Sequence, residues 1–199
     1  MENIMQILKR LDLEKNITLD DIPNIDLYMD QVIQLFESVF NSTRRDENEK
    51  VLTKTMINNY AKGGLFFPIK NKKYSKEHLL LISLIYQLKG TLSIQDIKAV
   101  LAGINKKISE EEFTLDAFYN SYIELTKKNV SSFYDEIPKT AESVKKELEH
   151  FTSDKDANYL EKALLITSLV HMSSLYRRVV EKLVDSIIEE QSEEKPKNK

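Results

Sequence analysis

The sequence predicts a mainly α-helical fold in which helices flank a central region that contains the turns. Only four glycines and four prolines occur in 199 residues, and so few backbone breakers favour long helices. All four glycines fall between residues 63 and 103. Outside this stretch, apolar residues recur at helical spacing. We therefore expect short β elements only in the centre of the chain.

The composition favours a globular protein of the cytoplasm. Apolar residues make up 41% and charged residues 31% of the chain, which is ordinary for a soluble domain. Residues 1–16 alternate apolar and charged side chains, unlike a signal peptide. The most apolar stretch, 79–88, is too short to cross a bilayer, so no membrane partner is expected. Without cysteine, disulfides and thiolate chemistry are excluded, and a reducing compartment is expected.

Two helices are expected before the central region. Residues 3–14 and 25–40 carry apolar side chains at helical spacing. Pro23 marks a turn between them, and residues 41–49 form a polar loop. Residues 1–49 are therefore predicted to be N-terminal helices that pack on the centre.

A helical bundle is expected after the central region. Its first two helices are predicted at residues 114–136 and 138–151, and a long last helix is predicted to open at Ser153 and run to about residue 190. The stretch Ser153 to Asp156 resembles a capping box that opens the last helix. We predict that residues 109–190 serve dimerisation or sensing, and that the polar tail 191–199 is disordered.

The last helix carries apolar residues at alternating spacings of four and three, as in a coiled coil. They are Leu165, Leu169, Met172, Tyr176, Val179 and Leu183. A second apolar row widens this face: Ile166, Val170, Val180, Val184 and Ile188. A wide face is typical of core burial, whereas a narrow seam is typical of pairing with a second helix. Both uses stay open, and a homodimer is expected to pair through this seam.

Positive charge is concentrated in residues 50–76, which we call the lysine segment. It contains seven lysines and no Asp or Glu. The whole chain carries a net charge of −3, and the chain outside this segment carries 22 basic and 32 acidic residues. A cationic segment on an anionic protein indicates contact with nucleic acid, although a solvated lysine-rich loop gives the same pattern.

A short helix is predicted over residues 53–62 in this segment. Thr53 is a good N-cap, and Gly63 and Gly64 supply a left-handed stop. One side is apolar and the other presents Lys54, Thr55, Asn58 and Lys62. Asparagine can pair with adenine, and lysine or threonine with guanine or phosphate, so this face suits a DNA-recognition helix.

A basic hairpin is predicted next, over residues 65–74. It consists of two short extended pieces around Asn71, with Pro68 at an edge. Its tip carries Lys70, Lys72 and Lys73, which can lie along a phosphate backbone. Ser75 then caps an apolar helix, and a capping-box variant at Ser93 starts a helix over 94–101. Residues 50–108 are therefore predicted to form a winged helix-turn-helix.

Two resemblances support this interpretation. The central segment resembles the DNA-binding domain of MerR-family regulators. The resemblance rests on the order of LTKTMINNYAK, Gly-Leu, a proline-containing wing, Tyr-Ser, an apolar helix and LSIQDIKAVL. The chain also resembles the bacterial family called domain of unknown function 1836, through IPNIDLYMDQV, LTKTMINNYAK and KKYSKEHLLLISLIYQLK. The fold class expected is mainly α, with a MerR-like winged helix-turn-helix, a small β wing and a C-terminal α-helical bundle.

The MerR resemblance implies DNA-facing positions. They are Lys54, Thr55, Asn58, Asn59 and Lys62 on the helix, and Lys72 and Lys73 on the wing, beside Lys70. Asn58 and Asn59 replace the arginine and first tyrosine of the MerR pattern. The short first helix of the motif is not recognisable, and bundle helices replace the usual coiled coil.

An enzyme is not expected. The sequence lacks the common metalloprotease, nucleotide-binding and serine-hydrolase motifs. A single Glu147-x-x-His150 pair falls short of a di-iron site, so no metal or cofactor is predicted. His78 is expected at the surface, and His171 is expected to pack in its helix.

An effector site in the bundle is a further hypothesis. Six aromatic residues either line such a pocket or form core: Phe113, Phe118, Tyr119, Tyr122, Phe133 and Tyr134. The function expected is that of a DNA-binding transcriptional regulator with duplex DNA as partner. The alternative is an adaptor that uses the winged scaffold to bind a protein without DNA.

Overall fold

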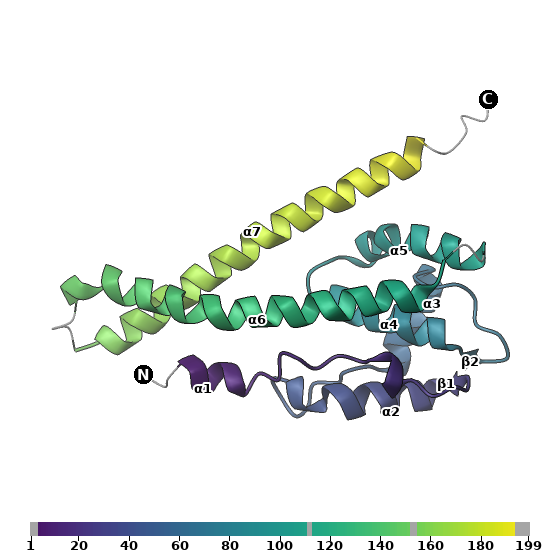
Figure 1. Cartoon of the computed structure of the whole chain (residues 1–199), viewed down its shortest axis with the longest axis horizontal. Coiled ribbons are helices and arrows are strands. Elements are labelled where there is room, and N and C mark those ends of the chain that lie inside the picture. The colour runs from purple at the N-terminus through teal and green to yellow at the C-terminus, as the bar shows by residue number, and fades with distance from the viewer. Residues whose placement is uncertain (1–3, 111–112, 152–154, 194–199) are drawn as a thin grey trace. The chain divides into compact units, whose positions relative to one another are not determined.

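The computed structural model describes residues 4–110, 113–151 and 155–193, and these residues are mainly helical (Figure 1). The α-helices are α1 (Ile4–Lys9), α2 (Met29–Phe40), α3 (Lys54–Gly63), α4 (Lys76–Leu88), α5 (Ile94–Ser109), α6 (Leu115–Glu147) and α7 (Ala157–Glu193). Short 3-10 turns occur at Leu19–Asp21, Asn41–Thr43 and Glu149–Phe151. Strands β1 (Leu27–Tyr28) and β2 (Lys73–Tyr74) pair antiparallel, with Leu27 opposite Tyr74 and Tyr28 opposite Lys73. The predicted mainly α fold is confirmed at this level.

The chain divides into two compact units. The large unit contains Lys15–Glu124 and Val180–Lys199, and the small unit contains Met1–Glu14 and Leu125–Val179. Helices α6 and α7 each contribute residues to both. The domain boundaries predicted from sequence, at residues 49, 108 and 190, stay predictions.

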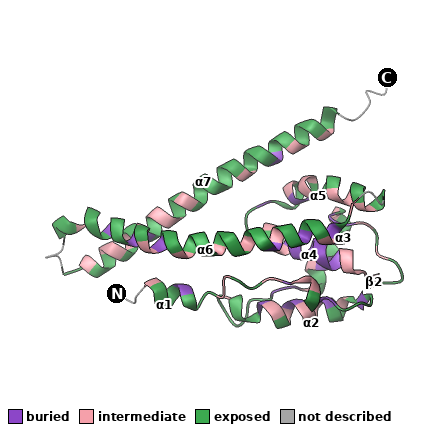
Figure 2. Cartoon of the chain, viewed as in Figure 1, coloured by how far each residue is buried: buried purple, intermediate pink, exposed green. Residues whose placement is uncertain are grey.

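Helix α4 is the centre of the large unit. Every residue from His78 to Ile85 is buried, and Figure 2 shows this helix in purple. A helix that is apolar on all sides is stable only when other elements surround it. The side chains packed in the same core include Phe36 of α2, Ile57 of α3 and Leu101 of α5. This core fixes α3 relative to α2 and α5.

The ends of α3 follow the local sequence signals. Thr53 Oγ1 accepts a hydrogen bond from Met56 N at 3.1 Å, which satisfies one of the open N–H groups at the helix start. Gly64 adopts φ 67°, and Leu65 N donates to Tyr60 O at 3.1 Å. This left-handed stop is unstrained only for glycine. The predicted N-cap and stop are confirmed.

Other predicted helix boundaries are wrong. The first helix ends at Lys9, five residues early, because the chain turns after it and Asp12 adopts φ 47°. The helix expected over residues 25–40 begins only at Met29, because residues 27–28 are strand β1. The helix expected to end at Leu101 continues to Ser109.

Helix α6 contradicts the break predicted at Pro138. It runs unbroken from Leu115 to Glu147 with Pro138 inside. Proline fixes a φ that suits a helix, but it removes one hydrogen bond and crowds the preceding turn, at a cost of about 3 kcal/mol. The buried Ile137, Ala141 and Val144 lie close by, and packing of these side chains offsets that cost.

Helix α7 divides the predicted seam. Leu165 is buried with Ala141 and Val144 in the core of the small unit, and Leu169 packs against that cluster. Tyr176, Val179 and Leu183 are instead 61–64% exposed. Figure 2 shows most of α7 as exposed. The first half of the seam is therefore core, and the second half is an exposed apolar stripe.

The ends of α7 fall at the limits of what the structure describes. The first two residues of the capping box predicted over residues 153–156 lie outside the described residues, and so do residues 194–199. Residues 191–193 of the predicted disordered tail are helical. None of the helices within the described ranges is long and apolar enough to cross a membrane.

Candidate nucleic-acid interface

Helix α3 presents two different faces. Ile57 is fully buried and Tyr60 is 4% exposed, so these side chains anchor the helix in the core. The opposite side is exposed and carries Lys54, Thr55, Asn58, Asn59 and Lys62. The structure thus brings all five predicted helix residues to one solvent-accessible surface. Amide, hydroxyl and ammonium groups in this arrangement can donate to base edges or phosphates.

The hairpin of residues 65–74, which we call the wing, has a tight turn at its tip. Lys73 N donates to Lys70 O at 2.9 Å, and the two residues between them, Asn71 and Lys72, adopt φ 51° and 58°. Two consecutive left-handed residues define the two-residue hairpin turn whose twist matches the flanking strands. Lys70 and Lys72 are exposed at this tip.

The wing pairs differently from the sequence expectation. Its first half forms only an isolated bridge between Lys70 and Lys73, and not an extended strand. Its second half, β2, pairs with β1 from residues 27–28. Strand β1 could not be predicted from the sequence, because it is only two residues long and lies in a segment with helical periodicity. Two residues are too few to show the period of two that is typical of a strand. The wing is therefore fixed to the segment that leads into α2.

Lys73 differs from the other wing lysines. It is half-buried, and its Nζ lies 5.3 Å from the ring centroid of Tyr28, within the range of a cation–π interaction. Tyr28 itself is 53% exposed. Sequence reasoning missed Tyr28 because its position beside Lys73 depends on the pairing of β1 with β2. The exposed phenol of Tyr28 is a further hydrogen-bonding group beside the wing.

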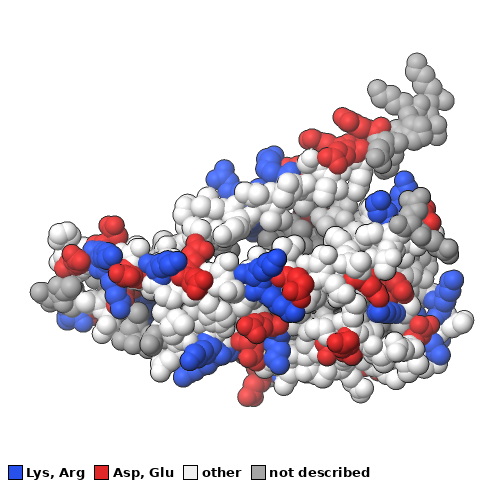
Figure 3. Space-filling view, viewed as in Figure 1, with Lys and Arg blue, Asp and Glu red and all other residues white. Residues whose placement is uncertain are grey.

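Acidic side chains from other elements reach the lysine segment. Lys54 Nζ lies 2.7 Å from Asp30 Oδ1 of α2, and Lys76 Nζ lies 2.6 Å from Asp116 Oδ2 of α6. The lysine segment itself contains no acidic residue, but these two carboxylates from α2 and α6 lie next to its lysines. Elsewhere, basic and acidic side chains alternate over the face shown in Figure 3, which is typical of a solvated surface.

Another lysine extends the basic surface beyond the segment. Lys98 of α5 is exposed, and its Nζ lies close to Gly64 at the end of α3. The distance from Nζ to the position that a Cβ atom on Gly64 would occupy is 3.6 Å. The ammonium group is therefore beside the C-terminal end of α3, where a positive charge is favourable. No local pattern around Lys98 indicates this position.

The surface position predicted for His78 is wrong. Its side chain is 3% exposed, because it lies between the wing and the start of α4. The Nδ1 atom accepts from Ser75 N at 3.1 Å, and Nε2 lies 3.1 Å from the carbonyl oxygen of Phe67. Burial lowers the pKa of this imidazole. The sequence predicts a surface position for His78 because the first turn of a helix is usually exposed.

The six aromatic residues proposed for an effector pocket are divided between the two units, four in the large unit and two in the small unit. Tyr119 is fully buried in the large unit, where its hydroxyl donates to Ile17 O at 2.7 Å and lies 2.7 Å from Ser83 Oγ. Burial raises the pKa of Tyr119 to about 12. Phe118 and Phe133 are exposed instead. These residues serve as core or surface.

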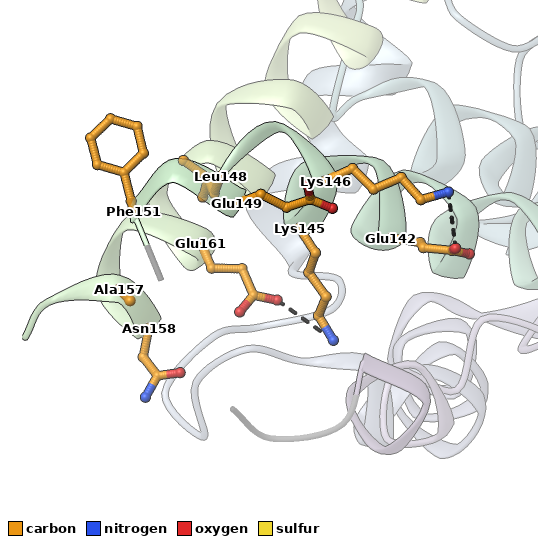
Figure 4. A pocket seen from close by; sticks show the side chains of 9 residues that line it. All are labelled: Glu142, Lys145, Lys146, Leu148, Glu149, Phe151, Ala157, Asn158 and Glu161. Atoms are coloured by element: carbon orange, nitrogen blue, oxygen red, sulfur yellow. Dashed lines mark ion pairs between the residues drawn. The ribbon is translucent and has the colours of Figure 1, made fainter. Parts of the chain in front are cut away.

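A cavity of about 400 Å³ occurs at the end of the small unit (Figure 4). Its lining is Glu142, Lys145, Lys146, Leu148, Glu149, Phe151, Ala157, Asn158 and Glu161. Figure 4 shows Lys145 and Glu161 pointing toward each other, with Nζ and Oε1 3.9 Å apart. Lys146 pairs with Glu142 at 3.1 Å. None of the six aromatic residues predicted to line an effector pocket belongs to this lining. Binding of an effector in the helical bundle therefore stays a prediction.

The histidines other than His78 lie at the surface. Within the part of the chain that the structure describes, no group of three or more His, Cys, Asp or Glu side chains could hold a metal ion. His150 and His171 are both exposed. The packing role predicted for His171 is therefore wrong, because its side of α7 faces solvent.

The fold and this surface define a mainly α-helical protein with a small antiparallel sheet and a lysine-bearing helix beside it. Residues 17–122 match the family model described as Domain of unknown function (DUF1836). The match covers more than half of the chain, so the protein belongs to this family. The matched segment includes the elements from β1 to α5, with the wing among them, and the start of α6. Neither the curated proteins nor the solved structures contain a match.

Proposed function

We propose that this protein is a DNA-binding transcriptional regulator that contacts duplex DNA through α3 and the wing. The observation that carries the proposal is the exposed face of α3. It combines Lys54, Thr55, Asn58 and Lys62 next to a hairpin whose tip presents two more lysines. A helix and a wing with these side chains suit simultaneous contact with base edges and phosphates.

The order of the elements supports a winged helix-turn-helix of the MerR type. Helix α2 packs on α3, so α2 is the candidate for the first helix that was not recognisable in the sequence. The wing follows α3, and α4 lies beneath both. In such a motif the second helix enters the major groove and the first crosses the backbone.

The side chains then take separate roles. In this proposal Asn58 and Thr55 read base edges, and Asn59, Lys54 and Lys62 contact bases or phosphates. Lys70 and Lys72 at the wing tip contact phosphate. Lys73 acts mainly through Tyr28, because its ammonium group lies over that ring.

A homodimer belongs to the same proposal. One α3 covers only half of an operator, and most helix-turn-helix proteins present two such helices about one DNA turn apart. Tyr176, Val179 and Leu183 form an exposed apolar stripe that a second copy can cover. A cytoplasmic location is expected, and an unknown effector in the helical bundle stays part of the proposal.

The alternative is a protein–protein adaptor. The ion pair between Lys54 and Asp30 favours it, because it reduces the positive charge on the face of α3. The two functions differ in their dependence on salt. Phosphate contacts release counterions, so DNA affinity falls steeply with salt, whereas an apolar protein interface responds weakly.

The experiment that tests the proposal is capture of genomic DNA fragments by the purified full-length protein. Fragments recovered at low salt are sequenced, and affinity for the enriched site and for random DNA is then measured over a range of salt. Enrichment of one site with a steep salt slope supports the regulator. Binding to no fragment at any salt excludes it and favours the adaptor.

A further inference from the structure

The two-stranded sheet of β1 and β2 has one buried and one exposed face. Side chains alternate between the faces of a strand, and residues directly opposite each other on paired strands share a face. Leu27 and Tyr74 form one such pair, and both are buried in the core of the large unit. Tyr28 and Lys73 form the other pair. The outer face of the sheet therefore carries Tyr28, which is 53% exposed, with Lys73 beside it.

Tyr28 is held in place from two sides. Its N–H donates to Gln31 Oε1 at 2.8 Å, a bond of the capping-box type at the start of α2. On the other side, the residue pairs with Lys73 in β2. The Lys73 Nζ lies 5.3 Å from the centroid of the Tyr28 ring, so a cation–π interaction restrains the ring as well. The exposed ring is therefore positioned before any partner binds.

Tyr28 lies between the exposed face of α3 and the wing. Two residues later, Asp30 in the first turn of α2 pairs with Lys54 in the first turn of α3, with Oδ1 and Nζ 2.7 Å apart. On the other side, Lys73 leads into the turn at the tip of the wing. Figure 1 shows β1 and β2 next to each other where the chain enters α2. The start of α2 thus joins α3 and the wing into one continuous surface.

We propose that Tyr28 is a further DNA-contacting residue, and that its ligand is the sugar-phosphate backbone of a strand that passes between α3 and the wing. The phenol donates a hydrogen bond to a phosphate oxygen, and the ring packs on the adjoining deoxyribose. Tyrosine is among the side chains that bind phosphate oxygens in protein–DNA complexes. This inference rests on the proposed function, because it names a contact within the same interface.

The charges around Tyr28 favour a neutral donor at this position. Asp26 and Asp30 flank it in the sequence, and both are exposed. A carboxylate repels phosphate, so this segment approaches the DNA backbone most readily through a side chain that extends beyond the carboxylates. The hydroxyl of tyrosine lies at the far end of the ring, further from the main chain than an aspartate carboxylate. It keeps its proton at neutral pH and can donate it to a phosphate oxygen.

A contact of this kind differs from a lysine contact in its dependence on salt. The hydroxyl carries no charge and reads no base, so it adds affinity without adding specificity or releasing counterions. Tyr28→Phe removes the hydroxyl and keeps the ring beside Lys73. We expect this variant to bind the enriched site and random DNA about three- to tenfold more weakly. The slope of log K against log salt should stay unchanged, whereas loss of a wing lysine lowers it.

The direct test uses tryptophan fluorescence. The chain contains no tryptophan, so Tyr28→Trp introduces the only indole and keeps an aromatic ring beside Lys73. Duplex DNA of random sequence is titrated into the full-length variant at low salt. We expect the indole emission to change with the same midpoint as DNA binding measured by anisotropy, because the ring loses contact with water on binding.

The matched control is Tyr159→Trp. It places the only indole on α7, at a residue that is 70% exposed and lies outside the proposed interface. Its emission should stay constant during the same titration. The free energy of unfolding should be nearly unchanged in all three variants, because both tyrosines are exposed. If Tyr28→Trp fails to fold, Tyr28→Phe decides alone, and binding as tight as that of the wild type would overturn the inference.

The outcomes separate this inference from the proposed function. DNA binding by the wild type, together with constant emission at position 28, overturns the contact by Tyr28 and leaves the regulator in place. An equal change of emission at position 159 also overturns it, because the emission then follows a change in the whole protein. A loss of affinity in Tyr28→Phe that is confined to the enriched site overturns the backbone as the ligand. Absence of DNA binding by the wild type at any salt refutes the proposed function, and this inference with it.

Discussion

Asn58 is the side chain of α3 from which base recognition is most directly expected. It is exposed on the same side as Lys54 and Thr55, and its amide can donate to and accept from adenine together. We predict that Asn58→Ala weakens binding to the enriched site by about 1–3 kcal/mol and leaves binding to random DNA nearly unchanged. Fluorescence anisotropy with both DNAs measures the difference.

Asn59→Ala is the matched control for Asn58. It removes the same amide from the neighbouring exposed position, nearer the flank of the face. We expect a smaller decrease in affinity that is similar for both DNAs, as for a residue that touches phosphate. An equal decrease on specific and random DNA for Asn58→Ala would show that this residue does not read bases.

Asp30 limits the positive charge on α3. Its carboxylate pairs with Lys54 at 2.7 Å, and both side chains are exposed, so the pair contributes only about 0–1 kcal/mol to stability. Asp30→Asn should therefore leave the free energy of unfolding nearly unchanged. It should also strengthen binding to all DNA sequences, because Lys54 becomes available and one negative charge leaves the face.

The control is Asp185→Asn, which removes one negative charge from the exposed pair of Lys182 and Asp185 on α7. Titrations of both variants with random DNA separate a local effect from net charge. If both variants gain affinity equally, Asp30 has no special relation to the interface.

At the scale of elements, the wing is expected to contribute affinity without specificity. The change Lys70→Gln with Lys72→Asn removes both charges and keeps the turn, because asparagine tolerates the φ of 58° at position 72. Binding should weaken for all sequences. The slope of log K against log salt should fall by about 0.9 for each phosphate that the variant no longer neutralises.

Lys106→Gln with Lys107→Gln on α5 is the control for the wing, since it removes two exposed charges from another element. A slope unchanged by the wing substitutions, or reduced equally by those on α5, would remove the wing from the interface. The salt titration therefore tests the element and not only the charge of the protein.

At the scale of the whole molecule, self-association is expected through α7. Tyr176→Glu with Leu183→Glu places charges on a stripe whose side chains are 61–64% exposed, so the fold should persist. We predict a monomer that binds DNA weakly, measured by light scattering and anisotropy. Because two linked half-sites act together, the decrease in affinity should exceed that caused by removing any single phosphate-binding side chain.

Leu165→Glu serves as the contrasting variant. Leu165 is 7% exposed in the core of the small unit, and a buried unpaired charge should destabilise that unit. Circular dichroism distinguishes this loss of structure from dissociation. Wild-type protein that is monomeric at micromolar concentration would exclude the stripe as a dimer surface.

The sequence by itself determined the features that depend on neighbouring residues. The N-cap at Thr53, the stop at Gly64 and the capping box at Ser93 were all predictable, because a cap joins groups only a few residues apart. The two faces of α3 were predictable as well, because helical periodicity separates buried from exposed positions. The mainly helical fold was also predictable, and so were the approximate positions of its helices.

Only the tertiary structure decided the features that depend on distant contacts. The pairing of β1 with β2, the pair of Asp30 with Lys54 and the burial of His78 all join segments remote in sequence. The division of the α7 seam, like the unbroken course of α6 through Pro138, depends on what packs against each helix. Periodicity shows which face of a helix is apolar, but burial depends on the free energy of contacts that the local sequence does not contain.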